Sequence, residues 1–278
     1  MIMKKYYFKD LNPALLKNLC QRKAIDFAGV LPVVENILRQ VKRRGDKAVR
    51  ELTRKFDGAN LASFQVRQKE IGNAGQNISQ DVKNAFIRAA RNIEKFHKAG
   101  MAARQEVETM PGITCFTEAR PIEKVGLYIP GGTAPLPSTV LMLAIPAKLA
   151  GCQDIILATP PGKNGKVAEI ILFVAKLCGL TKVFKIGGTQ AIAALAFGTE
   201  SMPKVYKIFG PGNQYVTAAK MLISIDPEGA AIDMPAGPTE TLVIADGQAP
   251  ADFAASDLLS QAEHGFDSQA ILVATSEK

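Results

Sequence analysis

Hydrophobic and polar residues follow a helical period in the first part of the chain. Apolar side chains recur every three to four positions over 31–56 and again over 79–103, which predicts two long amphipathic helices. Gly58 follows the first of them at the position where a left-handed residue commonly closes a helix. A polar turn comes next, and residues 64–66 are expected to form a short strand.

From about residue 115 the pattern changes to short apolar runs that alternate with helical segments. The expected strands are 124–129, 154–158, 182–186 and 205–209, and the expected helices are 138–149, 167–177, 190–197 and 214–223. Successive strand–helix units predict a parallel, doubly wound α/β sheet. Each strand ends in a Gly/Pro-rich turn, so these turns are expected to gather at the sheet edge where ligands bind. After them, strands at 241–245 and 269–274 are expected on either side of a helix at 252–263.

The turn after the first of these strands is rich in glycine. Gly131 and Gly132 allow a sharp turn or a close approach to a ligand, and Ser138 and Thr139 are suited to cap the following helix. A strand, a glycine loop and a helix N-terminus together commonly hold an anion. The loop lacks the full G-x-G-x-x-G spacing, so a tight turn without a ligand is the alternative at this point.

Composition and charge narrow the class of protein. No apolar run reaches the ~18 residues that a membrane span needs, and the first residues lack the apolar stretch of a signal peptide, so a cytoplasmic location is expected and no membrane partner. The four cysteines are widely spaced and are expected to be reduced thiols. Much of the net charge of +8 lies in residues 17–23 and 42–54, and the second cluster is expected to be the solvated face of an amphipathic helix. Aromatic residues are not interleaved with these charges and the chain has no Trp, which argues against a nucleic-acid partner.

Several long segments occur in one order along the chain. They are VGLYIPGGTAPLPSTVLMLAIPAKLAGC, IGGTQAIAALAFGTE, KIFGPGNQYVTAAK, AIDMPAGPTETLVIAD and DLLSQAEHG. Together they closely resemble the histidinol dehydrogenase family, and the RGD sequence at 44–46 and KFDG at 55–58 fit the N-terminal helices of that family. The resemblance covers essentially the whole chain.

The resemblance implies an α/β fold of two incomplete Rossmann-like domains with parallel sheets, similar to aldehyde dehydrogenases, with N-terminal helices. Residues 1–107 and 238–278 are expected to form one discontinuous domain, and 108–237 the cofactor-binding domain. The implied reaction is the zinc-dependent, four-electron oxidation of L-histidinol to L-histidine through histidinaldehyde, with two NAD in turn, at the end of histidine biosynthesis. A homodimer is also implied.

The motif match assigns cofactor contacts to the ends of three predicted strands. Tyr128, Gln190 and Asn213 resemble the NAD contacts of the family. The chemistry agrees, because Gln and Asn offer both donors and acceptors to ribose or phosphate oxygens, and a tyrosine ring can pack on a flat ring. From the residues alone, side chains that bond their own turns are the alternative.

The match also assigns metal and substrate contacts. Gln261 and His264 lie three residues apart, on one face of the expected helix, and resemble half of the zinc site, where they also contact substrate. Without the resemblance, His264 reads as an ordinary helix-end residue. Thr239 matches a substrate-binding position at which the family usually has serine; the hydroxyl is kept and a methyl group is added.

The general acid and base of the family are a Glu–His pair that is expected beyond Lys278, so no catalytic residue is assigned in this chain. Family members continue well past this point, and the chain is therefore expected to be truncated and inactive. Two alternatives stay open: a thiol-dependent aldehyde dehydrogenase using Cys115 or Cys152, and a non-catalytic fragment that binds nucleotide.

Overall fold

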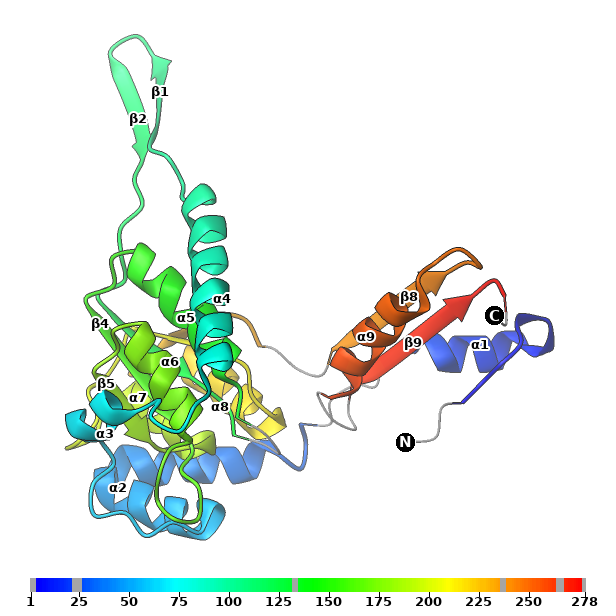
Figure 1. Ribbon diagram of the computed structural model, residues 1–278. Coiled ribbons are helices and arrows are strands. Elements are labelled where there is room, and N and C mark those ends of the chain that lie inside the picture. Colours follow the sequence, from blue (N-terminus) through cyan, green and yellow to red (C-terminus); the bar gives the residue numbers. More distant parts are fainter. Residues whose placement is uncertain (1–3, 22–26, 132–134, 236–238, 264–267, 277–278) are drawn as a thin grey trace.

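The fold is described by a computed structural model that covers residues 4–21, 27–131, 135–235, 239–263 and 268–276. The helices are η1 (Phe8–Asp10), α1 (Pro13–Cys20), α2 (Leu31–Asp57), α3 (Gln68–Asn73), α4 (Gln80–Ala99), α5 (Pro137–Leu149), α6 (Glu169–Leu177), α7 (Gly188–Phe197), α8 (Gln214–Ile225) and α9 (Ala251–Ala262). The strands are β1 (Gln105–Met110), β2 (Ile113–Thr117), β3 (Lys124–Tyr128), β4 (Asp154–Thr159), β5 (Lys182–Lys185), β6 (Lys207–Phe209), β7 (Ala231–Ile232), β8 (Glu240–Ala245) and β9 (Gln269–Ala274). The predicted succession of strands and helices after residue 115 is confirmed (Figure 1).

The central sheet has the strand order β5-β4-β3-β6-β7, and all its pairs are parallel. The predicted parallel, doubly wound sheet is thus confirmed. From β3 the chain moves outward through β4 to β5 and then returns to place β6 on the other side of β3. The carboxyl ends of β3 and β6 therefore flank the topological switch point, where open α/β sheets leave a crevice for ligands. Strand β7 was not predicted, because two residues give no periodic signal.

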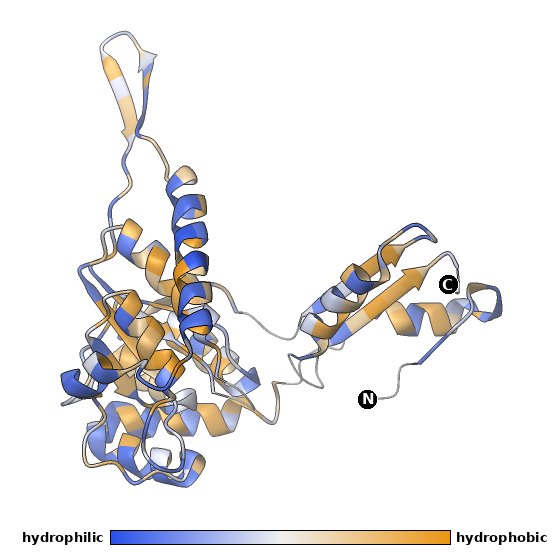
Figure 2. Ribbon diagram, in the orientation of Figure 1, coloured by the Kyte–Doolittle hydropathy of each residue, from blue (hydrophilic) through white to orange (hydrophobic). Residues whose placement is uncertain are grey.

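Alternate residues of the sheet point to opposite faces, and each face packs in its own hydrophobic core. Val125, Leu127 and Ile129 of the β3 segment pack with α5 and α6, and helices α3 and α4 cover these in turn. Tyr128 and its neighbours on the opposite face pack with α7 and α8, which α2 covers from outside. Figure 2 shows the hydrophobic positions concentrated in the sheet and in the helices against it. At Gly126 a Cβ would lie 3.0 Å from Leu195, so the glycine lets α7 approach the sheet closely.

Helix α2 is bent in the middle, which its apolar spacing did not predict. Gly45 has φ 50° and ψ −134°, and the helix resumes after it. The Glu200 carboxylate accepts a hydrogen bond from the Asp46 N–H at 2.7 Å, which satisfies a backbone donor that the bend exposes. The helix ends as predicted at Gly58, which has the left-handed φ of 66°.

Three local features differ from the expected elements. The strand expected at 64–66 does not form, and Gln65 makes only an isolated antiparallel bridge to Phe184. Ser138 and Thr139 lie inside α5 and the prediction that they cap it is wrong: Leu136 is the N-cap and Pro137 takes the first helical position. Proline fits there because its fixed φ suits the helix and its missing N–H is not needed. The antiparallel hairpin of β1 and β2 was also not predicted, because every residue of both strands is exposed and no apolar face marks it.

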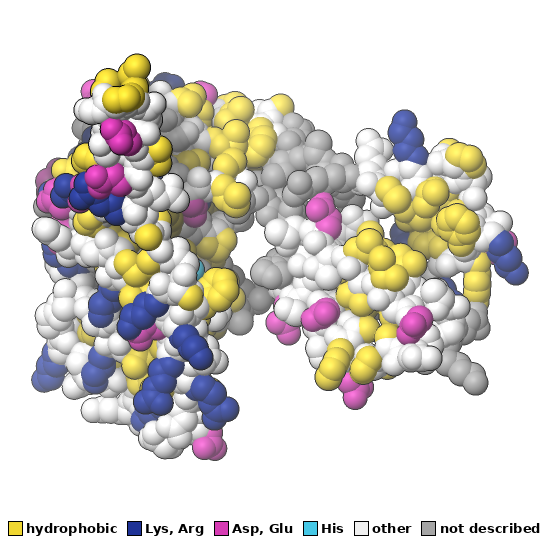
Figure 3. Space-filling view, turned by 90° about the horizontal axis from the view of Figure 1, so that it is seen from above, with side chains coloured by type: hydrophobic (Ala, Val, Ile, Leu, Met, Phe, Trp, Pro, Cys, Tyr) yellow, Lys and Arg dark blue, Asp and Glu magenta, His cyan; other side chains and the backbone are white. Residues whose placement is uncertain are grey.

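A smaller body is built from β8, α9, β9 and α1. β8 and β9 pair in parallel along their full lengths and α9 packs on both, while Gln269 Nε2 donates to the Leu19 carbonyl of α1 at 3.4 Å. Hydrophobic side chains gather on the surface of this body in Figure 3. Exposed examples are Leu242, Ile244, Phe253 and Leu259.

The packing groups α2, α3 and α4 with the central sheet. The division into 1–107 plus 238–278 and 108–237 stays a prediction. Among the described residues, no helix combines the length and apolar character that crossing a bilayer requires.

Candidate active site

The turns at the carboxyl edge of the sheet are in direct contact. A Cβ on Gly131 would lie 2.4 Å from Pro160 Cγ, and a Cβ on Gly187 would lie 2.4 Å from Pro160 Cβ. The turns after β3 and β5 therefore pack closely on Pro160, which lies in the turn after β4. The predicted gathering of these turns at one edge is confirmed for the described residues. Gly132 lies outside them.

Tyr128 closes β3 beside the switch point and is only 3% exposed. Its phenolic oxygen accepts a hydrogen bond from the Gly188 N–H at 2.9 Å, so it satisfies the first N–H of α7. Burial raises the pKa of Tyr128 to about 12, and the hydroxyl remains protonated at neutral pH. The ring is enclosed, so Tyr128 shapes the floor of the edge rather than presenting a free face.

Gln190, in the first turn of α7, is 1% exposed, and its Nε2 donates to Asp57 Oδ2 at 3.3 Å. The structure thus brings Tyr128, Gln190 and Asp57 together, since the Asp57 charge also raises the pKa of Tyr128. This role of Asp57 was not predicted. Its position before Gly58 marks it only as the end of a helix, and no local pattern links it to residue 190.

Asp57 makes stability depend on pH. Burial raises its pKa from 3.8 to about 6, against the smaller opposing effect of the Gln190 hydrogen bond. The native chain therefore binds more protons than the unfolded chain between these values, and stability falls as pH rises from about 4 to about 6. We expect Asp57→Asn to raise the free energy of unfolding at pH 8 by about 1–2 kcal/mol, discounted for the partial exposure of the carboxyl group.

Most of this gain should disappear at about pH 4, where Asp57 of the native wild type is neutral. Urea unfolding at both pH values measures it, and Glu35→Gln on the solvent side of the same helix is the control. Equal stability of Asp57→Asn and the wild type at pH 8 would contradict the assigned pKa.

Asn213 is exposed and caps α8. Its Oδ1 accepts hydrogen bonds from the N–H groups of Tyr215 and Val216, both at 3.1 Å. The side chain thus bonds its own loop, which was the alternative interpretation, and it also lies at the accessible end of a helix. Thr189 Oγ1 donates to the Tyr215 carbonyl at 3.5 Å, so the N-termini of α7 and α8 lie side by side.

Gln261 is 7% exposed on α9 and has three hydrogen bonds. Its Nε2 donates to the Thr239 carbonyl at 2.6 Å and to Thr239 Oγ1 at 2.9 Å, and its Oε1 accepts from Thr241 Oγ1 at 3.2 Å. The structure thus joins two of the predicted substrate residues. His264 lies outside the described residues.

The described residues do not by themselves fit a zinc ion. A catalytic zinc site usually has three protein ligands. No group of three His, Cys, Asp or Glu side chains is suitably placed within the described ranges, and Gln261 Oε1 already accepts one hydrogen bond. Gln261 could supply one ligand, and the metal assignment stays a prediction.

Comparison with known proteins identifies the family. The family model described as histidinol dehydrogenase matches residues 20–278. The chain belongs to the histidinol dehydrogenase family. It is 56% identical to the histidinol dehydrogenase of Bacteroides thetaiotaomicron over 99% of this chain and 63% of that protein, and 52% identical to that of Vibrio cholerae with the same coverage.

A solved relative has the same fold. The crystal structure of histidinol dehydrogenase from Elizabethkingia anophelis superimposes with a TM-score of 0.87 at 50% identity, covering 96% of this chain and 61% of that one. The chain spans between 57 and 64% of the length of the curated histidinol dehydrogenases compared.

Cys152 and Cys178 are poorly suited to a nucleophilic role. Cys115 is exposed on the β1–β2 hairpin, where Thr109 Oγ1 lies 3.9 Å from its sulfur. Burial raises the pKa of Cys152, and it raises that of Cys178 to about 11, so both resist ionisation. The raised pKa weighs against Cys152 as the nucleophile of a thiol-dependent aldehyde dehydrogenase.

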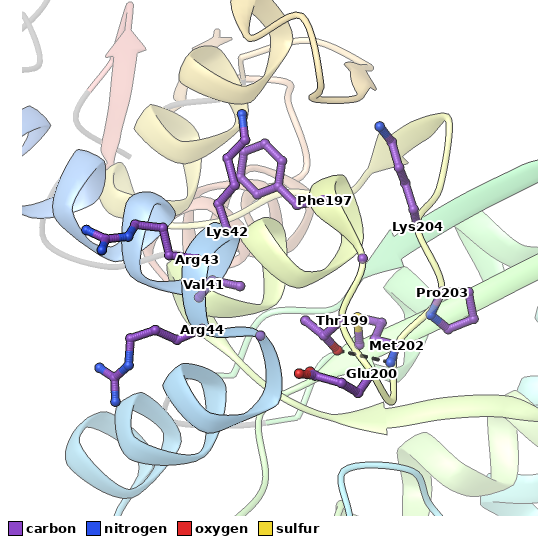
Figure 4. A pocket seen from close by; sticks show the side chains of 12 residues that line it. Val41, Lys42, Arg43, Arg44, Phe197, Thr199, Glu200, Met202, Pro203 and Lys204 are labelled. Atoms are coloured by element: carbon purple, nitrogen blue, oxygen red, sulfur yellow. Dashed lines mark hydrogen bonds between the residues drawn. The ribbon is translucent and has the colours of Figure 1, made fainter.

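A hollow of about 500 Å³ lies at the opposite, amino-terminal edge of the sheet (Figure 4). The bend of α2 and the turn between α7 and β6 line it, and Figure 4 shows Glu200 pointing toward α2 while Arg43 and Lys204 point outward. Three of its four cations are engaged: Lys42 contacts Asp226 and Glu228, Arg44 contacts Glu51, and Lys204 donates to the Glu228 carbonyl. The hollow therefore belongs to the packing of α2.

Proposed function

We propose that this chain supplies the NAD-binding edge, and part of the zinc and substrate site, of an oxidoreductase that converts L-histidinol to L-histidine through histidinaldehyde in histidine biosynthesis. The proposal rests on the contact of the turns after β3, β4 and β5, and on the approach of Gly210, after β6, to the end of β3, in a chain of this family. The switch point is where open α/β sheets bind dinucleotides.

The residues at this edge fit a dinucleotide by shape and polarity. Glycine turns leave room for the backbone to approach a pyrophosphate, and the N-termini of α7 and α8 favour its negative charge. Asn213 is exposed, and the Tyr215 ring beside it is 40% exposed. Tyr128 and Gln190 are buried and support this edge indirectly. Tyr128 binds the N–H of Gly188 and Gln190 binds Asp57, and both contacts fix the start of α7. Bound NAD would accept hydride from the substrate, and the role of these residues is to position it.

The smaller body would hold the substrate. Its Gln261 amide is oriented by Thr239 and Thr241, so the three side chains act as one polar unit. With His264 it would bind zinc in the complete site. We derive no step through the metal and assign no residue as the general base. A second incomplete Rossmann-like domain around β8 and β9, a homodimer and a cytoplasmic location belong to the same proposal.

Calorimetric titration with NAD tests the cofactor site. We expect Asn213→Ser to weaken NAD binding about tenfold, because serine keeps the helix cap but removes the amide. Ser79→Ala, which removes the cap of α4, is the matched control and should leave NAD binding unchanged. Failure of the wild-type chain to bind NAD at millimolar concentration would overturn the cofactor assignment.

Turnover is tested separately, by following histidinol-dependent NADH formation with added zinc. This chain is compared with the full-length relative from Bacteroides thetaiotaomicron. NAD binding without turnover would match a nucleotide-binding fragment. Robust turnover by this chain alone would show that its own residues supply the acid and base that we leave unassigned.

A further inference from the structure

One lysine is buried on the inner side of α8, among residues that the motif match did not assign. Lys220 is 2% exposed. Its Nζ donates to the Gly210 carbonyl at 2.8 Å, to Asp233 Oδ1, and to the Met234 carbonyl at 3.3 Å. All three donors of the ammonium group thus have an acceptor, which is what a buried charge requires.

Asp233 completes the arrangement from the segment after β7. Its second oxygen accepts a hydrogen bond from the Gly210 N–H at 2.8 Å. The N–H and the C=O of Gly210 are therefore both held, one by Asp233 and the other by Lys220. This is a strong constraint on a single loop residue, because the two side chains also bind each other.

Gly210 is also the point at which this loop touches β3. Its φ is 126°, and a Cβ there would lie 2.1 Å from the Tyr128 carbonyl oxygen. Gly210 therefore lies against the end of β3, at the switch point itself. Asn213 follows three residues later and starts α8. The position of Gly210 consequently determines where Asn213 stands relative to Tyr128.

We propose that Lys220 and Asp233 are a positioning pair that fixes the 210–213 loop against the end of β3 and so sets the dinucleotide-binding edge before the cofactor arrives. This inference rests on the proposed function. It assigns the pair no contact with the cofactor; the pair acts through Gly210 and Asn213. A preset loop binds tighter because less order must be created on binding.

A positioning role can be separated from a purely structural one. Removing one partner of a buried ion pair is costly because it leaves the other charge unpaired, whereas replacing both often restores stability. Lys220→Met should therefore destabilise the chain, and Lys220→Met with Asp233→Asn should recover much of the loss. The double variant still lacks the donor to the Gly210 carbonyl, so NAD binding should not recover.

The experiment combines NAD calorimetry with thermal unfolding and amide hydrogen exchange of the unliganded chain. We expect the exchange of the Gly210 N–H to speed up about tenfold in Asp233→Asn, which cannot accept from both Lys220 and Gly210 as the carboxylate does. We expect NAD affinity to fall about tenfold in Asp233→Asn and in the double variant. Lys42→Met is the matched control, because it breaks an exposed lysine–aspartate pair at the other end of α8.

The outcomes distinguish this inference from the proposed function. Unchanged exchange at Gly210 in Asp233→Asn would overturn the positioning role, whatever happens to NAD binding. Recovery of NAD affinity together with stability in the double variant would also overturn it. If the wild-type chain binds no NAD, the proposed cofactor site fails, and the exchange of Gly210 still decides whether the pair holds the loop.

Discussion

Replacing Gly210 with alanine is expected to lower the free energy of unfolding by about 3 kcal/mol and to abolish NAD binding. The added Cβ would lie 2.1 Å from the Tyr128 carbonyl oxygen and 3.2 Å from its nitrogen, and φ is 126°. Both neighbouring atoms belong to the backbone of a central strand, so they cannot move aside as a flexible side chain would. Urea unfolding and NAD calorimetry measure the two effects.

Gly72→Ala is the control for this prediction. Gly72 lies within α3, and a Cβ there would meet nothing within 4 Å. Alanine should therefore stabilise the helix by up to ~1 kcal/mol through its better helix propensity. If Gly210→Ala kept wild-type stability, the close approach of the loop to β3 would not be a requirement of the fold.

Phe184→Ala is expected to cost about 3–5 kcal/mol of unfolding free energy. Phe184 is 2% exposed and belongs to the apolar cluster formed by the sheet, α2, α7 and α8. Its loss leaves a cavity that rigid neighbouring strands cannot close. Because the chain has no Trp, urea unfolding is followed by circular dichroism. Phe96→Ala is the matched control, since Phe96 is 76% exposed and its loss should change stability by less than about 0.5 kcal/mol.

The Phe184→Ala variant also tests whether α2 and the central sheet unfold together. Its apolar residues, among them Val34, Val41 and Val49, share the cluster with Phe184. We expect the amide protection of α2 to fall together with that of β5. Protection of α2 that persists while the sheet loses it would show that α2 is stabilised independently of the sheet.

Strong periodic patterns made most of the fold predictable. The β3 segment is an apolar run between turn residues, and its alternating side chains enter two cores, so its strand character was plain from the sequence. β1 and β2 are wholly exposed, and nothing in their polarity marks a hairpin. The start of α5 was misplaced because serine and threonine are good caps, yet Pro137 occupies the first helical position.

The candidate site was predictable only where a motif marked it. The positions at strand ends and the family segments indicated Tyr128, Gln190 and Asn213. They did not indicate that Tyr128 and Gln190 are buried. Gln190 bonds Asp57, which lies 133 positions earlier in the chain. The buried position of Lys220 was not predicted for a different reason. A lysine on a helix is expected to face solvent, and only the fold shows the acceptors that allow its burial.

The bend at Gly45 divides α2 into two segments, and the second segment connects the two edges of the sheet. At the amino-terminal edge, Glu200 accepts a hydrogen bond from the backbone of this segment just after the bend. At the carboxyl-terminal edge, Asp57 at the end of the segment accepts a hydrogen bond from Gln190. The segment from the bend to Asp57 is about 18 Å long, so a tilt of only about 10° would displace its end by about 3 Å. This displacement is enough to break the hydrogen bond between Gln190 and Asp57. A substitution at Glu200 is therefore expected to weaken the contact between Asp57 and Gln190 at the opposite edge of the sheet.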